Sequence, residues 1–416
     1  MAAAGVTAAD RGQEFMTLSI HFVQDCPAVI WGLTARQRMS RVLAAAGVTA
    51  VAEELESLRE GDRVLMLRCD YLIDDRLLHY LASTPGVLLQ VGRGPSSAMV
   101  AAHVPASLAK GALSAVRGGE TAAPLPGVQV QTLADLSISF QEKLRKFDPP
   151  FVLPVSEGQR ERLERTLFEW SYKGVTDLVT KWAWPLPARW AVRQCVRTGI
   201  QPNHVTLASL VLVILAGFLF AWGHFGWGLA AAWLMTFLDT VDGKLARVTV
   251  TSSPFGHYFD HLIDLFSPPI WYLLWGAGLA AVDPGGLFYS LRGVLWLIVA
   301  GYVAGRLAEL GFKRLLGRFG IFCWQPMDAY IRLVTARRNP NLILLTAFTL
   351  GGRPDLGLLA VMFWTVVTSV VLVLRLLYAG YVRAGEGPLR SWFTQARDPR
   401  YADSLAVRLF TRDLSV

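Results

Sequence analysis

The sequence has few cysteines and no cysteine pattern that would bind a metal. The 4 cysteines among its 416 residues are widely scattered, with no CxxC pair and no histidine at zinc-ligand spacing. We interpret them as packing residues. The chain also lacks a basic N-terminal segment that leads into an apolar run, so we expect no cleaved signal peptide and a cytoplasmic first segment.

The first part of the chain lacks long apolar runs. A membrane helix needs about 18 apolar residues, whereas the runs at residues 19–23, 64–69 and 87–91 are much shorter. These runs are mixed with helical stretches, which is typical of an α/β unit. Residues 1–147 are therefore predicted to form a cytoplasmic α/β domain.

The composition as a whole is too apolar for a wholly water-soluble protein. Hydrophobic residues make up 53% of the chain, and its mean hydropathy is +0.38. A net charge of +8 and 14 tryptophans would suit nucleic acid binding, but charges and indole rings beside apolar spans usually mark a membrane interface. We expect an integral membrane protein with no nucleic-acid partner.

Residues 148–201 are predicted to link the α/β domain to the membrane. A proline-containing connector leads into a charged stretch, and residues 166–197 then interleave aromatic and basic side chains. That pattern is typical of a helix lying in the headgroup layer. A water-soluble amphipathic helix is the alternative. The interleaved residues are Trp170, Tyr172, Lys173, Lys181, Trp182, Trp184, Arg189, Trp190 and Arg193.

Apolar spans dominate the chain after Pro202 and predict a six-helix membrane domain over residues 202–380. The six spans cover residues 205–222, 227–238, 258–281, 287–307, 342–350 and 356–379. The second is expected to continue through the polar residues after 238, and the fifth to begin near 335. Residues 381–416 are predicted to form a cytoplasmic tail.

Basic residues set the predicted orientation in the inner (cytoplasmic) membrane. Arg193 and Arg197 precede the first span, and a larger group lies between the fourth and fifth spans. Because positive loops stay in the cytoplasm, both termini are predicted to lie there. The larger group comprises Lys313, Arg314, Arg318, Arg332, Arg337 and Arg338.

Four aspartates beside the predicted spans are the strongest functional signal. Asp239 and Asp242 are three residues apart, and Asp260 and Asp264 are four apart, so each pair can share one face of a helix. Ionisable groups at membrane depth are rarely tolerated without a partner. Because four carboxylates at one centre repel one another, hard divalent cations are the expected counter-charge. We predict one or two Mg²⁺ or Mn²⁺ ions.

The residues between the two pairs suit a pyrophosphate. Gly243, Ala246 and Gly256 are small enough for a ligand to approach the backbone, and Arg247 can contact phosphate through two N–H groups. Metal ions would polarise the phosphate, and Asp264 is predicted to take the proton of an attacking hydroxyl. Helix caps and packing glycines are the structural alternative, but they explain only one or two of these positions.

Together these residues match every fixed position of the signature DxxDGxxARx8GxxxDxxxD, and residues 202–379 resemble the CDP-alcohol phosphotransferase family. The resemblance implies a six-helix, homodimeric membrane enzyme. It would move a phosphoalcohol group from a CDP-linked donor to an alcohol acceptor, with at least one of them a lipid, and release CMP. By the same resemblance, two metal ions are held by Asp239, Asp242, Asp260 and Asp264, with Asp264 also the base. The nucleotide site would be lined by Asp239, Gly243, Ala246, Arg247 and Gly256.

Two further features concern substrates. Arg332, Arg337 and Arg338 lie on the predicted cytoplasmic side and are candidates for binding an acceptor phosphate, although topology-setting charge is an equal alternative. The segments 29–43 and 64–75 faintly resemble nucleotidyltransferases that act on sugar or inositol phosphates. The glycine-rich phosphate loop of those enzymes is missing around Trp31 and Gly32, so we expect a degenerate domain.

Two other functions stay open at this point. A bifunctional enzyme would also make its own CDP-alcohol in the N-terminal domain, where Asp70 is the remaining candidate metal ligand. A transporter or channel would also explain acidic residues at membrane depth, but it predicts polar residues along several spans. In this sequence the acidic residues at membrane depth are instead confined to one short stretch.

Overall fold

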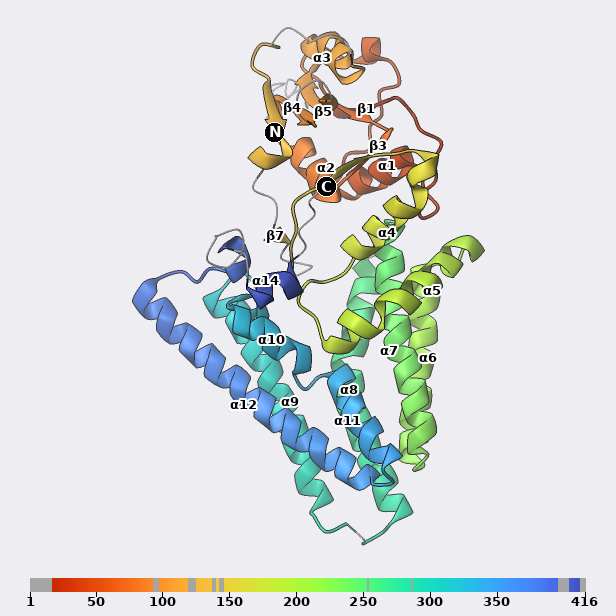
Figure 1. Ribbon diagram of the computed structural model, residues 1–416, viewed down its shortest axis with the longest axis vertical. Helices are drawn as coiled ribbons and strands as arrows, with labels where there is room; N and C mark the ends of the chain where they lie inside the picture. The colour runs from red at the N-terminus through yellow and green to blue at the C-terminus, as the bar shows by residue number, and fades with distance from the viewer. Residues whose placement is uncertain are drawn as a thin grey trace, which may run out of the picture. The chain divides into compact units, whose positions relative to one another are not determined.

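Figure 1 shows the computed structural model of the chain, which describes residues 17–92, 97–118, 125–136, 140–141, 146–252, 254–285, 287–395 and 404–411. The chain divides into two compact units. The N-terminal unit contains Met1–Ile138 and Pro150–Leu163, and the C-terminal unit contains Ser139–Pro149 and Glu164–Val416. Most of the segment predicted to link the two domains therefore belongs to the C-terminal unit.

The N-terminal unit is built on a five-stranded mixed sheet in the order β1-β2-β5-β4-β6. The outer pairs β1–β2 and β4–β6 are parallel, while β2–β5 and β4–β5 are antiparallel. The strands are β1 (Leu18–Val23), β2 (Arg63–Arg68), β4 (Val87–Val91), β5 (Ala98–Pro105) and β6 (Gln129–Thr132). A short antiparallel pair joins β3 (Tyr71–Ile73) to β9 (Val152–Pro154). The predicted α/β region is confirmed.

Helices cover the sheet because its strands are apolar on both faces. Residues 64–67 of β2 are completely buried, and successive side chains of a strand point to opposite faces. α3 (Ala109–Val116) packs its alanines and Val116 against Val64 and Met66. α1 (Ala35–Ala45) and α2 (Asp75–Ser83) lie together on the other side of the sheet (Figure 1).

The C-terminal unit is almost entirely helical. Its main helices are α5 (Pro185–Thr198), α6 (Pro202–Ala221), α7 (Phe225–Val248), α8 (Pro254–Val282), α9 (Leu291–Gly311), α10 (Pro326–Val334), α11 (Arg338–Leu350), α12 (Pro354–Glu386) and α14 (Leu405–Phe410). α4 (Arg160–Trp170) leads into the unit. Most of these helices run alongside one another in Figure 1.

Four helices in the described part of the chain are long and apolar enough to cross a bilayer. They cover Pro202–Ala221, His261–Val282, Leu291–Leu316 and Pro354–Glu386, which match four of the six predicted spans. The other two predictions fall in α7 and α11, and the spans there are not confirmed. The second half of α7 is charged, and α11 has only 13 residues, fewer than a straight span needs.

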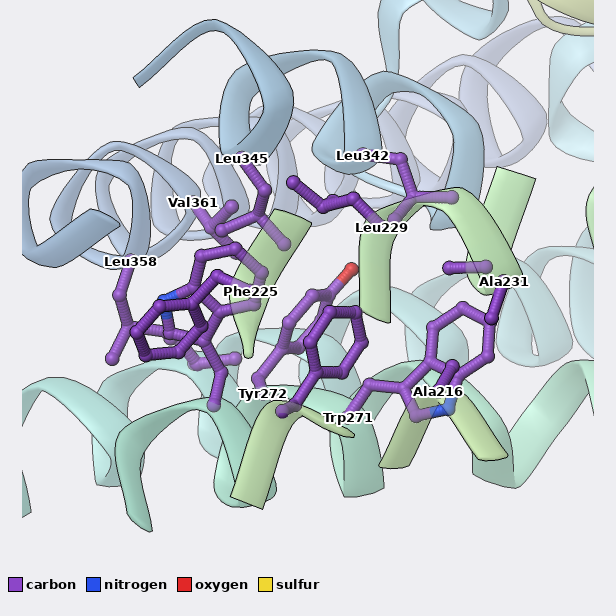
Figure 2. Packing of buried hydrophobic residues seen from close by; sticks show 14 of the residues in the cluster. Ala216, Phe225, Leu229, Ala231, Trp271, Tyr272, Leu342, Leu345, Leu358 and Val361 are labelled. Atoms are coloured by element: carbon purple, nitrogen blue, oxygen red, sulfur yellow. The ribbon is translucent and has the colours of Figure 1, made fainter. Parts of the chain in front are cut away.

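Aromatic and aliphatic side chains fix these helices to one another. Figure 2 shows Phe225, Trp271 and Tyr272 packed together with leucines of α11 and α12. The rings of Phe225 and Trp275 lie 4.5 Å apart, and Gly278 brings α8 close to the backbone of α6 at Phe220. This packing fixes α7 and α8, the two helices that carry the signature residues, against α6, α11 and α12.

Candidate active site

The four signature aspartates lie on two helices, one pair on each. Asp239 and Asp242 lie one turn apart in the polar half of α7, and Asp260 and Asp264 lie one turn apart in α8. The side chain of Asp260 lies outside the described part of the structure. The helical spacing inferred from the sequence is therefore present in the backbone at both pairs.

Arg338 connects the two helices through their carboxylates. Its Nη2 donates to Asp239 Oδ2 at 2.5 Å, and its Nη1 donates to Asp264 Oδ1 at 2.6 Å. Arg338 is the first residue of α11, so this one guanidinium draws three helices to a common centre. Hydrogen bonds between ionised groups are short and about twice as strong as neutral ones.

Asp242 lies deeper than its neighbours and has a partner that the sequence did not reveal. Only 6% of Asp242 is exposed, and its Oδ2 accepts a hydrogen bond from the hydroxyl of Thr206 at 2.9 Å. Thr206 lies in the first turns of α6. A hydroxyl close to the start of an otherwise apolar span was the only available signal for it.

The carboxylates suit a hard divalent cation by their chemistry. No group of three acidic, histidine or cysteine side chains among the described residues forms a metal site. Asp239 and Asp264 nevertheless point at one shared cationic group, and Asp242 lies one helical turn from Asp239. Carboxylate oxygens are the ligands that Mg²⁺ and Mn²⁺ prefer. By their chemistry alone the described donors suit the predicted metal, and its site stays a prediction.

Two basic side chains of α7, Arg247 of the signature and Lys244 beside it, contact the segment that precedes α5. Arg247 Nη1 donates to the backbone oxygen of Ser171 at 2.9 Å, and Lys244 Nζ donates to the same oxygen at 3.0 Å. The Lys244 ammonium also lies 3.1 Å from the centre of the Tyr172 ring. Gly243 and Ala246 are partly exposed on α7, and Gly256 is partly exposed on α8.

The three arginines proposed for the acceptor have different surroundings. Arg338 binds the aspartates, and Arg337 forms an ion pair with Glu309 of α9. Arg332 is buried, and its guanidinium lies 5.7 Å from the centre of the Phe322 ring. Their shared charge was the only feature that grouped them in the sequence, and the contact of Arg338 with the signature aspartates has no signal there.

The N-terminal unit has a tight turn at the place of the missing phosphate loop. Trp31 and Gly32 have φ angles of +50° and +77°, and Ile30 and Leu33 exchange backbone hydrogen bonds across them. The Trp31 side chain is buried, with 1% of the residue exposed. The carboxylate of Asp70 is engaged by Arg68 through two hydrogen bonds of 2.9 and 2.5 Å.

Comparison with known families agrees with the signature. Residues 200–316 match the family model for CDP-alcohol phosphatidyltransferase. This match contains all four aspartates together with the whole of α6, α7, α8 and α9. Residues 200–316 are therefore similar to a CDP-alcohol phosphatidyltransferase domain.

Curated relatives match the chain over part of their length. A bifunctional IPC transferase and DIPP synthase of Rubrobacter xylanophilus is 33% identical over 126 residues, or 28% of this chain and 29% of that protein. A phosphatidylinositol phosphate synthase of Mycobacteroides abscessus is 31% identical over 125 residues, or 28% of this chain and 55% of that protein. Human ethanolaminephosphotransferase 1 is 26% identical over 160 residues, or 33% of this chain and 39% of that protein.

Proposed function

We propose that this protein transfers a phosphoalcohol group from a CDP-linked donor to an alcohol acceptor and releases CMP. The observation that carries the proposal is the complete signature with Asp239 and Asp264 directed at one cationic centre. The family match and the relatives support the reaction class. At least one of the two substrates is a lipid.

The aspartates have separate roles in this proposal. Asp239, Asp242 and Asp260 would hold one or two Mg²⁺ or Mn²⁺ ions, and Asp264 would be both a ligand and the base. When bound, the ions polarise the phosphates and stabilise the charge on departing CMP. Asp264 suits proton transfer because 41% of its side chain is exposed, whereas Asp242 is buried.

The acceptor reaction follows from that assignment. Asp264 takes the hydroxyl proton of the acceptor as the acceptor oxygen forms a bond to the donor phosphorus. The bond between that phosphorus and the CMP oxygen breaks, and CMP leaves with its electron pair. Gly243, Ala246, Arg247 and Gly256 would line the nucleotide side with Asp239. Arg332, Arg337 and Arg338 remain candidates for contact with the acceptor.

The membrane placement is also part of the proposal. α7 and α11 would complete a domain of six membrane-spanning helices. This domain would lie in the inner membrane with both termini of the chain in the cytoplasm, and the protein would form a homodimer. The segment before α6 would lie in the headgroup layer. Its large apolar side chains at Trp182, Leu186 and Trp190 are 56%, 74% and 66% exposed, which suits contact with lipid.

A bifunctional enzyme is the second candidate. The name of the Rubrobacter xylanophilus relative, a bifunctional IPC transferase and DIPP synthase, favours it. The buried Trp31 turn and the pairing of Asp70 with Arg68 favour a degenerate N-terminal unit instead. CTP consumption by the purified protein would support the bifunctional reading.

The first experiment measures CMP release by the purified protein in detergent with Mg²⁺. CDP-diacylglycerol and soluble CDP-alcohols are each tested against inositol phosphate, glycerol phosphate and diacylglycerol. Asp264→Asn is compared with Asp283→Asn, which changes an exposed aspartate just after α8. We expect release that needs both substrates and is lost in Asp264→Asn alone. If no pair yields CMP, or if both variants match the wild type, the proposed function is wrong.

A further inference from the structure

A short segment before α5 contacts two of the helices that form the active site. Its first residue, Ser171, accepts hydrogen bonds from Lys244 and Arg247 of α7. Further along the segment, Asp177 reaches α11 through Asn339. The segment is thus tied to α7 beside Asp242 and to α11 beside Arg338.

Asp177 is a buried carboxylate whose oxygens are well satisfied. Only 6% of the residue is exposed. Its Oδ1 accepts from the backbone N–H of Thr180 at 3.0 Å and from the Asn339 side-chain amide at 2.9 Å. Its Oδ2 accepts from the hydroxyl of Thr180 at 2.9 Å. A buried group with this many partners has a single position.

The charge of Asp177 is also balanced. Burial acts to raise the pKa of this carboxyl, but the positive charge of Arg332 and the hydrogen bonds from Thr180 and Asn339 outweigh it, so the pKa is lowered. Asp177 is therefore ionised at neutral pH. A negative charge close to the first turn of α11 is also favoured by the helix dipole.

Asn339 and Arg338 are consecutive residues in the first turn of α11. Because the helix backbone is rigid, fixing the side chain of Asn339 also fixes the Cα of Arg338. The Arg338 guanidinium must reach Asp239 and Asp264 at once, at 2.5 and 2.6 Å. Such geometry tolerates displacements of only about 0.5 Å.

We propose that Asp177 is a positioning residue, which holds the first turn of α11 through Asn339 so that Arg338 stays between Asp239 and Asp264. The inference rests on the proposed transferase function and adds a role for a residue about 60 positions before the signature. Asp177 itself touches none of the four aspartates through its described hydrogen bonds.

The test compares Asp177→Ala, Asn339→Ala and the double variant with the wild type, measuring kcat and KM per folded molecule. We expect kcat to fall about tenfold to a hundredfold in each single variant, with the KM of the CDP-donor nearly unchanged. The double variant should be no worse than either single one, because both remove the same link. Asp177→Asn keeps an acceptor oxygen and should recover part of the rate.

Glu164→Ala is the matched control. Glu164 is an equally buried acid in the same unit, with 7% of the residue exposed, and it pairs with Arg193 at 3.1 Å. Its loss should lower the thermal unfolding midpoint and leave kcat per folded molecule unchanged. If Asp177→Ala does not fold, Asn339→Ala and Asp177→Asn carry the same test.

Two results would overturn the inference. One is that folded Asp177→Ala or Asn339→Ala has the same kcat as the wild type. The other is that the fold-decrease of kcat in the double variant equals the product of the fold-decreases in the two single variants. Failure of the transferase function is distinct, because the wild type itself would then release no CMP.

Discussion

The guanidinium of Arg338 lies 2.6 Å from the carboxylate of Asp264, although 74 residues separate the two in the chain. The same guanidinium binds Asp239, so α7, α8 and α11 meet at this arginine. An arginine can bind two carboxylates at once because its planar group carries five donors in a fixed arrangement.

Replacing Arg338 with lysine should slow transfer strongly. A lysine ammonium is a compact point charge and cannot match the paired geometry at Asp239 and Asp264. We expect a loss of about 10- to 100-fold in kcat/KM for Arg338→Lys. CMP release with saturating Mg²⁺ measures it. Arg353→Lys is the control, since Arg353 pairs with Asp355 near the start of α12; equal losses in both variants would contradict the prediction.

The four-aspartate centre should depend on metal. Removing divalent cations with EDTA should abolish CMP release, and added Mg²⁺ or Mn²⁺ should restore it, because the carboxylates offer hard oxygen ligands. Asp264→Asn should lower kcat by about 10²- to 10⁴-fold, the usual contribution of a general base. Asp242→Asn should instead raise the Mg²⁺ concentration needed for half-maximal rate. Activity that survives both EDTA and Asp264→Asn would argue against a metal-dependent transferase.

The helices of the candidate active site were predictable because their signals are local. The spacing of Asp239 and Asp242 in α7, and of Asp260 and Asp264 in α8, is by itself enough to indicate a helical face. The long apolar runs of α6, α9 and α12 were predictable for the same reason. Functional residues that lie within one or two turns of the same helix produce a spacing that can be recognised in the sequence.

Contacts between distant segments were not predictable. Nothing near Arg338 indicates that it meets Asp239, because the pairing depends on how α11 packs against α7 and α8. Thr206 was not predicted because a single hydroxyl in an apolar helix is common. Asp177 was not predicted because its partner Asn339 lies 162 residues away in the chain. The spans predicted at α7 and α11 remain unconfirmed because one helix is charged and the other is short.

The contact of α8 with α6 should be sensitive to a single methyl group. A Cβ at Gly278 would overlap the backbone oxygen of Phe220, which cannot move aside as a flexible side chain can. Gly278→Ala should therefore destabilise the protein by about 1–3 kcal/mol through overpacking. Gly380→Ala in α12 is the control, because a Cβ there meets no atom within 4 Å. Thermal unfolding in detergent should show a lower midpoint for Gly278→Ala only.

The N-terminal unit should lose stability in mild acid through His103. Burial lowers the pKa of this imidazole in the folded unit, where its Nδ1 lies 2.7 Å from the backbone oxygen of Leu81. The unfolded chain then takes up the proton first, at a pKa of about 6.5. The contribution of neutral His103 is therefore fully present above that pH and is lost as the pH falls below it.

His103→Gln should remove this pH dependence, because glutamine can still donate to the oxygen of Leu81 but does not titrate. The measurement is limited proteolysis of the full chain between pH 5 and 8, following cleavage within the N-terminal unit. We expect the wild type to become more susceptible as the pH drops below about 6.5, and the variant to change less. If the two proteins respond to pH in the same way, other groups titrate on unfolding and the pKa of His103 is the same in the folded and unfolded states.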